Sequence, residues 1–406
     1  MTFRSIRKGL IPLFLASLLC PPSAHASETG WVPLWTASAQ PVWDNDTSFF
    51  QTGLPQQVAG TVAEQPLTLS LPSENIRIEF SNRYAGAPLG LADGQVRCLG
   101  HGGDDSAVPM TFAHAKTVSI PAGARAVSDP VAVAGCHRIA VRVRFTGADS
   151  GDFHWDGRET SHYVTADGKE GTMTARLALS AVYGDARARD VVVALGDSIT
   201  DGNGAPIDAM ARWPDYLSQQ LAPHDIAVIN AGISGNRLLA PGMGRPVVER
   251  IADDAFALPG ADTVVLLIGT NDIAWPGTPF QPDEPPMTLA ALLDGFRSIF
   301  AQAELHGTRL IVATIAPFGD ALPGTPMEGN YWTPGKEDLR LAFNAWLRDN
   351  HGSAELFDLD RLLADPSDPA HLRPAYDSGD RLHPGATGNR AIADALVPLI
   401  LSGERK

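Results

Sequence analysis

The fold is decided by the stretch Val191-Val192-Val193-Ala194-Leu195-Gly196-Asp197-Ser198-Ile199-Thr200-Asp201-Gly202. Its apolar residues run without polar alternation into Gly-Asp-Ser, and the pattern then turns polar. Such a run is typical of a strand that is buried on both faces, as in a parallel sheet. We therefore expect Ser198 just past the carboxyl end of a strand, where α/β sheets bind their ligands. A serine that caps an ordinary loop would have the same local pattern.

Downstream of this stretch, apolar strands alternate with helical segments, which predicts a parallel α/β sheet. The predicted strands are 191–195, 226–229, 263–268, 310–315 and 355–357, and the predicted helices are 214–221, 247–257, 289–306, 337–350 and 386–400. Two long loops, 275–287 and 317–336, are rich in Pro and Gly and follow strand ends on the same rim as Ser198. They carry aromatic residues, so we interpret Trp275, Tyr331 and Trp332 as candidate walls of a substrate site.

Upstream, residues 27–187 alternate apolar and polar side chains with a period of two, for example at Ile139, Val141, Val143 and Phe145. This period indicates half-buried strands, and clusters of Gly, Pro, Asn and Asp separate the runs. We predict an antiparallel β-sandwich accessory domain over residues 27–187 and a second domain over residues 188–402.

The first 26 residues have the pattern of a secretory signal peptide, with a basic start, a short apolar run and cleavage near Ala26. This predicts a secreted or periplasmic protein. The net charge of the whole chain is −15, and removal of Arg4, Arg7 and Lys8 makes it more negative. Such acidity argues against nucleic acid as a partner and against stable association with anionic membranes.

After cleavage, Cys98 and Cys136 are the remaining cysteines. Two cysteines in an exported chain predict one disulfide, although two buried free thiols are the alternative. His154 and His162 lie near Asp156 and Glu159, but their spacing is not that of a helical ligand pair. We interpret them as surface or structural histidines, not as metal ligands.

A serine becomes a nucleophile when a base takes its proton and a third group orients that base. The candidate base is His383, in Asp380-Arg381-Leu382-His383-Pro384 at the start of the last predicted helix. Asp380 can accept a hydrogen bond from one ring nitrogen while the other nitrogen faces Ser198. By itself, such a segment is more commonly an Asp that caps a helix beside an exposed His.

Two further strand ends offer donors for a developing oxyanion. Gly235, in Asn230-Ala231-Gly232-Ile233-Ser234-Gly235-Asn236, has no side chain to keep its backbone N–H away from a substrate. Asn271, in Gly269-Thr270-Asn271-Asp272, offers a side-chain amide. Each segment alone is also compatible with a simple turn or helix cap, but their occurrence at successive strand ends of one sheet favours catalysis.

Together these segments resemble the GDSL esterases of the SGNH hydrolase family. The matching residues are Gly196-Asp197-Ser198 with Ile199 in the first block, Gly235 in the second, Gly269-Thr270-Asn271-Asp272 in the third, and Asp380 with His383 in the fifth. The resemblance covers about residues 188–402 and implies a flavodoxin-like, three-layer α/β/α fold. The segments Trp35-Thr36-Ala37-Ser38, Ile78-Glu79-Phe80-Ser81-Asn82 and Ser128-Asp129-Pro130-Val131 resemble secreted bacterial members with a β-sandwich before the hydrolase domain.

The resemblance implies a nucleophile at Ser198, a base at His383 oriented by Asp380, and no metal or cofactor. The implied oxyanion donors are the backbone N–H groups of Ser198 and Gly235 and the side chain of Asn271. We interpret the chain as a secreted serine esterase that acts through an acyl-enzyme, with acetylated carbohydrate as the first substrate to consider. A broad short-chain esterase or a lysophospholipase-like lipase is the alternative, and a non-catalytic glycan-binding protein is the alternative from another class.

Overall fold

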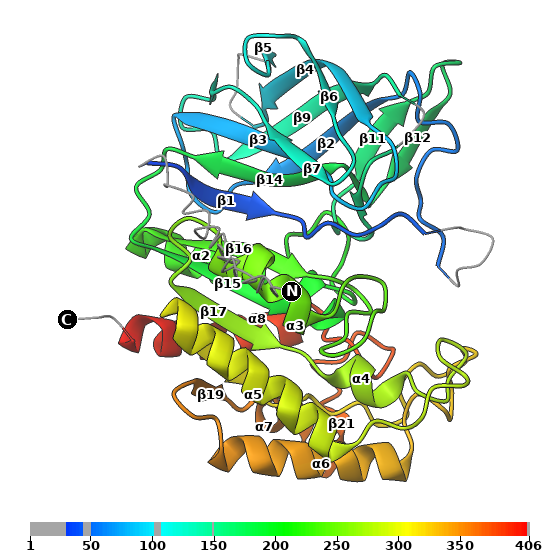
Figure 1. Ribbon diagram of the computed structural model, residues 1–406. Coiled ribbons are helices and arrows are strands. Elements are labelled where there is room, and N and C mark those ends of the chain that lie inside the picture. Colours follow the sequence, from blue (N-terminus) through cyan, green and yellow to red (C-terminus); the bar gives the residue numbers. More distant parts are fainter. Residues whose placement is uncertain (1–29, 44–49, 101–106, 148–149, 404–406) are drawn as a thin grey trace, which may run out of the picture.

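The computed structural model describes residues 30–43, 50–100, 107–147 and 150–403 (Figure 1). The predicted signal peptide, residues 1–26, lies outside these ranges. Within them, no helix combines the length and the apolar character that a membrane crossing requires. Figure 1 shows a β-rich region stacked on an α/β region.

Two antiparallel sheets build the β-rich region, as the period-two alternation predicts. The first has the order β1-β14-β3-β7 with β8 beside β3, and the second has the order β12-β11-β2-β9-β4-β5 with β6 beside β4. Ile78 and Phe80 of β3 and Val141 and Phe145 of β9 point into one core between the sheets. The strands are β1 (Val32–Thr36), β2 (Val62–Thr68), β3 (Asn75–Asn82), β4 (Leu89–Cys98), β5 (Val108–Pro109), β6 (Thr117–Ile120), β7 (Ala124–Val127), β8 (Val131–Ala132), β9 (Arg138–Phe145), β11 (Ser161–Val164), β12 (Glu170–Met173) and β14 (Leu179–Gly184), with β10 (Phe153–His154) and β13 (Arg176–Leu177) as a separate pair.

The α/β region is a parallel sheet with the order β16-β15-β17-β18-β19, which is the flavodoxin-like order. On β15, Val191 and Val193 pack toward α3, α5 and α6, whereas Val192 and Ala194 pack toward α2 and α8. The prediction of a strand buried on both faces is therefore confirmed. The elements are β15 (Asp190–Gly196), α1 (Ser198–Asp201), α2 (Trp213–Leu221), η1 (Ala222–His224), β16 (Ile226–Gly232), α3 (Val247–Ile251), η2 (Ala252–Phe256), β17 (Thr263–Leu267), α4 (Thr270–Ala274), α5 (Leu289–His306), β18 (Arg309–Ala313), α6 (Pro334–Asp349), β19 (Glu355–Phe357), α7 (Leu359–Leu363), β20 (Ala364–Asp365), β21 (Asp368–Leu372) and α8 (Ala386–Ser402).

Two predicted helices differ from the structure for identifiable reasons. The helix expected over 247–257 is α3 followed by the π-helical turn η2. The helix expected from residue 337 starts at Pro334, because the Thr333 side chain caps it by accepting from the Lys336 N–H and proline suits the first helical position. The sequence does not predict the short helices α4 and α7, since five residues are too few to show a helical period.

The two regions share a continuous packed interface. Strand β1 runs beside β16, and the Thr36 hydroxyl donates to the Asn230 carbonyl at 2.8 Å. A disulfide between Cys98 and Cys136, whose Cα atoms are 6.0 Å apart, links β4 to the segment before β9. We propose a domain boundary between residues 187 and 188, because β14 is the last strand of the β-rich region and β15 is the first strand of the parallel sheet.

Candidate active site

Three adjacent strands end at one edge of the parallel sheet and bring the predicted segments together. Strand β15 ends at Gly196, just before Ser198, while the neighbouring strands β16 and β17 end before Gly235 and Asn271. A Cβ atom on Gly196 would lie 2.3 Å from the carbonyl oxygen of Leu267, which ends β17. Glycine at this position therefore allows the strand ends to pack closely enough to form one site.

Hydrogen bonds join the side chains of Ser198, His383 and Asp380 in a line. Ser198 Oγ lies 2.8 Å from His383 Nε2, and His383 Nδ1 lies 2.6 Å from Asp380 Oδ2. Burial by itself would raise the pKa of Asp380, but the hydrogen bond and charge of His383 hold this pKa well below its usual range. The carboxylate thus accepts the Nδ1 proton in a hydrogen bond, and Nε2 is left to accept the proton of the Ser198 hydroxyl.

The loop at Gly235 excludes a side chain. Gly235 has a φ of +70°, and a Cβ atom there would lie 2.6 Å from Met243 Sδ and 2.9 Å from the Trp275 ring. Among the residues that the structure describes, neither the Ser198 N–H nor the Gly235 N–H has a hydrogen-bond acceptor. Both groups are therefore available to donate to a bound oxyanion.

The Asn271 side chain is oriented by two hydrogen bonds. Its Nδ2 donates to the carbonyl of Asn236, the residue after Gly235, at 2.9 Å, and its Oδ1 accepts from the Tyr331 hydroxyl at 2.8 Å. Burial raises the pKa of Tyr331, so the hydroxyl keeps the proton that it donates. The second Nδ2 hydrogen of Asn271 is then left for a substrate oxygen.

The aromatic residues predicted as substrate walls differ in exposure. Trp275 and Tyr331 are 5% and 2% exposed, so they are buried supports behind Gly235 and Asn271 and not free stacking surfaces. Trp332 is half-buried, and its Nε1 lies 3.3 Å from Glu337 Oε2. The structure therefore does not place the first two as exposed walls of the site, because their loops fold back against the core.

Two buried carboxylates next to the site were not assigned a role from the sequence. Asp272 accepts the backbone N–H groups of Leu238 and Leu239 at 2.7 and 3.1 Å, and it thereby ties the loop after β16 to α4. Asp197 accepts from the Ile199 N–H and caps α1, the helix that begins with Ser198. Burial raises the pKa of Asp197 to about 7 and that of Asp272 to about 6.

A polar hollow of about 580 Å³ adjoins the acid of the triad. It is lined by Ser378, Gly379 and Arg381, which surround Asp380 in the chain, and by the facing residues Asp320, Asp365, Asp368, His371, Leu372, Pro374 and Asp377. Most residues that line this hollow thus carry a charged or hydroxyl side chain.

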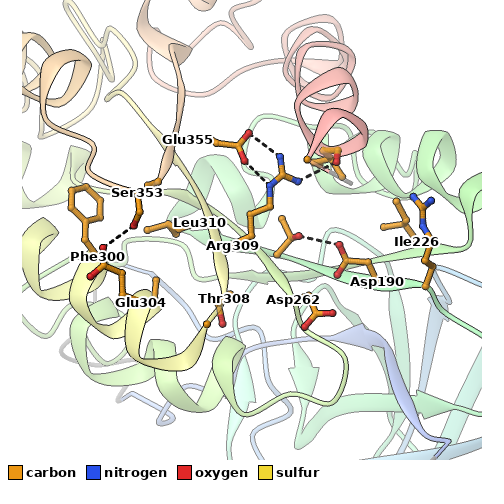
Figure 2. A pocket seen from close by; sticks show the side chains of 17 residues that line it. Asp190, Ile226, Asp262, Phe300, Glu304, Thr308, Arg309, Leu310, Ser353 and Glu355 are labelled. Carbon is orange, nitrogen blue, oxygen red and sulfur yellow. Dashed lines mark hydrogen bonds and ion pairs between the residues drawn. The ribbon is translucent and has the colours of Figure 1, made fainter. Parts of the chain in front are cut away.

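A second cavity, of about 590 Å³, lies at the opposite edge of the sheet (Figure 2). Its lining includes Asp190, Ile226, Thr263, Arg309 and Glu355, the first residues of the five parallel strands. Figure 2 shows the ion pair from Arg309 to Glu355 within the lining. The Thr263 hydroxyl also donates to Asp190 there, at 2.9 Å. These two contacts join the first residues of neighbouring strands. The cavity therefore lies at the amino ends of the strands, remote from Ser198.

Residues 194–391 match the model of the GDSL-like Lipase/Acylhydrolase family. The α/β region is a domain of this family. The chain is accordingly a carboxylic ester hydrolase, and the resemblance seen in the sequence is confirmed. The search of curated proteins finds no match.

Several solved structures are similar to the chain at low identity. An acetyl xylan esterase, AlAXEase, shares 22% identity over 52% of this chain and 99% of its own, with a TM-score of 0.38. A carbohydrate acetylesterase family member from Sinorhizobium meliloti shares 18% identity over 52% of this chain and 98% of its own, with a TM-score of 0.39. A family two carbohydrate esterase from Cellvibrio japonicus shares 12% identity over 93% of this chain and 96% of its own, with a TM-score of 0.39. These likenesses are too distant to transfer a substrate or a site residue.

The Tyr331–Asn271 hydrogen bond predicts that Tyr331→Phe impairs turnover in this GDSL-like hydrolase. Without the hydroxyl, the Asn271 amide loses one of its two orienting bonds. We expect kcat on p-nitrophenyl acetate to fall about tenfold, which is less than the 10²–10³-fold cost of deleting an oxyanion donor, with little change in KM. Tyr163→Phe, on the distant strand β11, is the control. Unchanged kcat in Tyr331→Phe, or an equal loss in the control, would contradict this role.

The raised pKa of Asp197 predicts how stability depends on pH. Its pKa of about 7 in the folded state exceeds the ordinary value of 3.8, so the folded chain holds this proton while the unfolded chain loses it. The contribution of Asp197 to stability therefore falls as the pH rises from about 4 to 7. Asn can cap α1 without titrating.

We expect the unfolding free energy of Asp197→Asn, relative to wild type, to increase by about 2 kcal/mol between pH 5 and pH 8. Urea denaturation at both pH values measures this difference. Asp338→Asn, at an exposed position of α6, is the matched control. A difference that stays constant or decreases with pH would show that Asp197 is not protonated in the fold.

Proposed function

We propose that the chain is a secreted serine esterase that hydrolyses carboxylic esters through an acyl-enzyme, with acetylated carbohydrate as its substrate class. The observation that carries the mechanism is the continuous hydrogen-bonded line from Ser198 Oγ through His383 to Asp380. The adjacent N–H groups of Ser198 and Gly235 and the oriented amide of Asn271 support it.

In the proposed reaction, Ser198 Oγ attacks the ester carbonyl carbon and its proton passes to His383 Nε2. The carbonyl oxygen becomes an oxyanion and accepts from Ser198 N–H, Gly235 N–H and Asn271 Nδ2. His383 then gives the proton to the leaving alcohol as the ester C–O bond breaks, which leaves an acyl group on Ser198. Water attacks this acyl group with His383 as base, and the acid product leaves as Ser198 recovers its proton.

The polar hollow beside Asp380 supports a hydroxyl-rich alcohol rather than a lipid. Its lining of carboxylates, His371 and Arg381 can exchange hydrogen bonds with sugar hydroxyls, whereas a long acyl chain would gain little from burial among charged groups. Secretion is supported by the signal-peptide pattern of residues 1–26 and by the Cys98–Cys136 disulfide, since disulfides persist in oxidising compartments.

Covalent labelling tests the mechanism. An organophosphonate ester should modify wild-type protein at one residue, Ser198, as located by peptide mass spectrometry. Ser198→Ala should take up no label and lose turnover on p-nitrophenyl acetate, because the proposed acyl-enzyme forms on the Ser198 oxygen. Ser298→Ala, at an exposed position of α5, is the control for labelling. Modification at a different residue would remove Ser198 as the nucleophile.

Substrate comparison tests the proposed class. We expect acetate release from acetylated xylan, and a kcat/KM for acetyl esters about tenfold or more above that for octanoyl and longer esters. Arg381→Ala, in the polar hollow, should raise KM for acetylated xylan and leave KM for p-nitrophenyl acetate unchanged. A preference for long acyl chains would instead favour the lipase-like alternative. Glycan binding without any hydrolysis would favour a binding protein.

A further inference from the structure

A histidine of the β-rich region reaches into the α/β region behind the candidate oxyanion hole. His154, on β10, is 4% exposed, although the sequence left open a surface position. Its Nε2 lies 2.9 Å from Asp201 Oδ1, and its Nδ1 lies 3.0 Å from the Ser38 carbonyl oxygen. A carbonyl can only accept a hydrogen bond, so Nδ1 carries a proton.

The partner of His154 is an ionised carboxylate. The second oxygen of Asp201 accepts from both the backbone N–H and the hydroxyl of Ser234, at 2.8 and 2.6 Å. Burial by itself would raise the pKa of Asp201, but His154 and Ser234 hold it below its ordinary value, while the charge of Asp201 raises the pKa of His154 against the effect of burial. The contact is thus a buried ion pair between the two regions.

This ion pair links the helix that carries the nucleophile to the loop that carries Gly235. Asp201 ends α1, three residues after Ser198, and Ser234 directly precedes Gly235. His154 fixes the carboxylate, and the carboxylate fixes both hydrogen-bonding groups of Ser234. The direction of the Gly235 N–H therefore depends on a side chain from the other region.

The other side of Gly235 is held from the same region. Ser38 Oγ lies 3.4 Å from Arg250 Nη1, and Arg250 donates through Nε to Asn236, the residue after Gly235, at 2.9 Å. Gln40, which is fully buried, donates to the Met243 carbonyl at 2.7 Å, and the Met243 sulfur packs where a Gly235 side chain would lie. Contacts on both sides of Gly235 thus originate in the β-rich region.

We propose that His154 is a positioning residue for the oxyanion hole, and that the β-rich region is part of the catalytic unit through the His154–Asp201–Ser234 contacts. This inference rests on the proposed function, because it takes Gly235 N–H as an oxyanion donor. It differs from the role of a separate glycan-binding module, which would leave the chemistry at Ser198 unchanged when its own residues are altered.

The test compares His154→Leu, which keeps bulk but no donor, with His154→Gln, which keeps one donor for Asp201. His162→Leu, at an exposed position of β11, is the control. All are measured on the full-length chain, and kcat is divided by the number of sites that react with an organophosphonate ester. This division separates a smaller folded fraction from slower turnover at each folded site.

We expect His154→Leu to lower kcat per reactive site by about 10–100-fold with KM within about threefold, and His154→Gln to recover part of that loss. Combining His154→Leu with Ser234→Ala should cost no more than the larger single change, because both act on one contact path. If His154→Leu does not fold, Ser234→Ala alone should still lower kcat per site several-fold.

Three results would overturn the inference. The first is full kcat per reactive site in His154→Leu or, where that variant does not fold, in Ser234→Ala. The second is a loss in the double variant equal to the product of the two single losses, and the third is an equal loss in His162→Leu. Failure of wild-type Ser198 to react with the phosphonate would instead overturn the proposed function, so the two failures are distinguishable.

Discussion

The close packing of the carboxyl ends of β15, β16 and β17 is the constraint on which the site depends. Adjacent strands lie about 4.8 Å apart, so residues just beyond their ends are within reach of one another. A Cβ atom on Gly196 would clash with the Leu267 carbonyl oxygen, so glycine at this position allows the ends of β15 and β17 to keep that spacing. Ser198, Gly235 and Asn271 lie close together because each follows one of these three adjacent strand ends.

Buried charges hold this edge in a single arrangement. Asp272 secures the loop after β16, Asp201 secures Ser234, and Arg250 donates to the carbonyls of Gly196 and Ala231 at two strand ends. Hydrogen bonds to charged groups are stronger than those between neutral groups, and removing one partner leaves a costly buried charge. Such contacts suit a site whose donors must stay aimed at an atom that becomes charged only during the reaction.

The interface between the regions gives the β-rich region a direct bearing on the chemistry. His154 and Gln40 are fully enclosed where they meet the loops around Gly235, and β1 packs along β16. The loops on the rim contribute differently. The Tyr331 hydroxyl orients Asn271 through a hydrogen bond, whereas Arg381 lines the polar hollow. The Tyr331 contact thus supports the oxyanion side of the site, whereas the polar hollow adjoins the acid of the triad.

By itself the sequence determined the parallel sheet, its main helices, the antiparallel region before it and the identity of Ser198, Gly235, Asn271, Asp380 and His383 as one candidate set. These features show as local periods, or as short segments at strand ends. Only the tertiary structure decided that Trp275 and Tyr331 are buried supports and that Asp272 and Asp201 hold the loops. It also decided that His154 pairs with Asp201, 47 residues further along the chain. The reason is physical: burial and hydrogen-bond partners depend on contacts between distant segments, and no local pattern of side chains records which segments will meet.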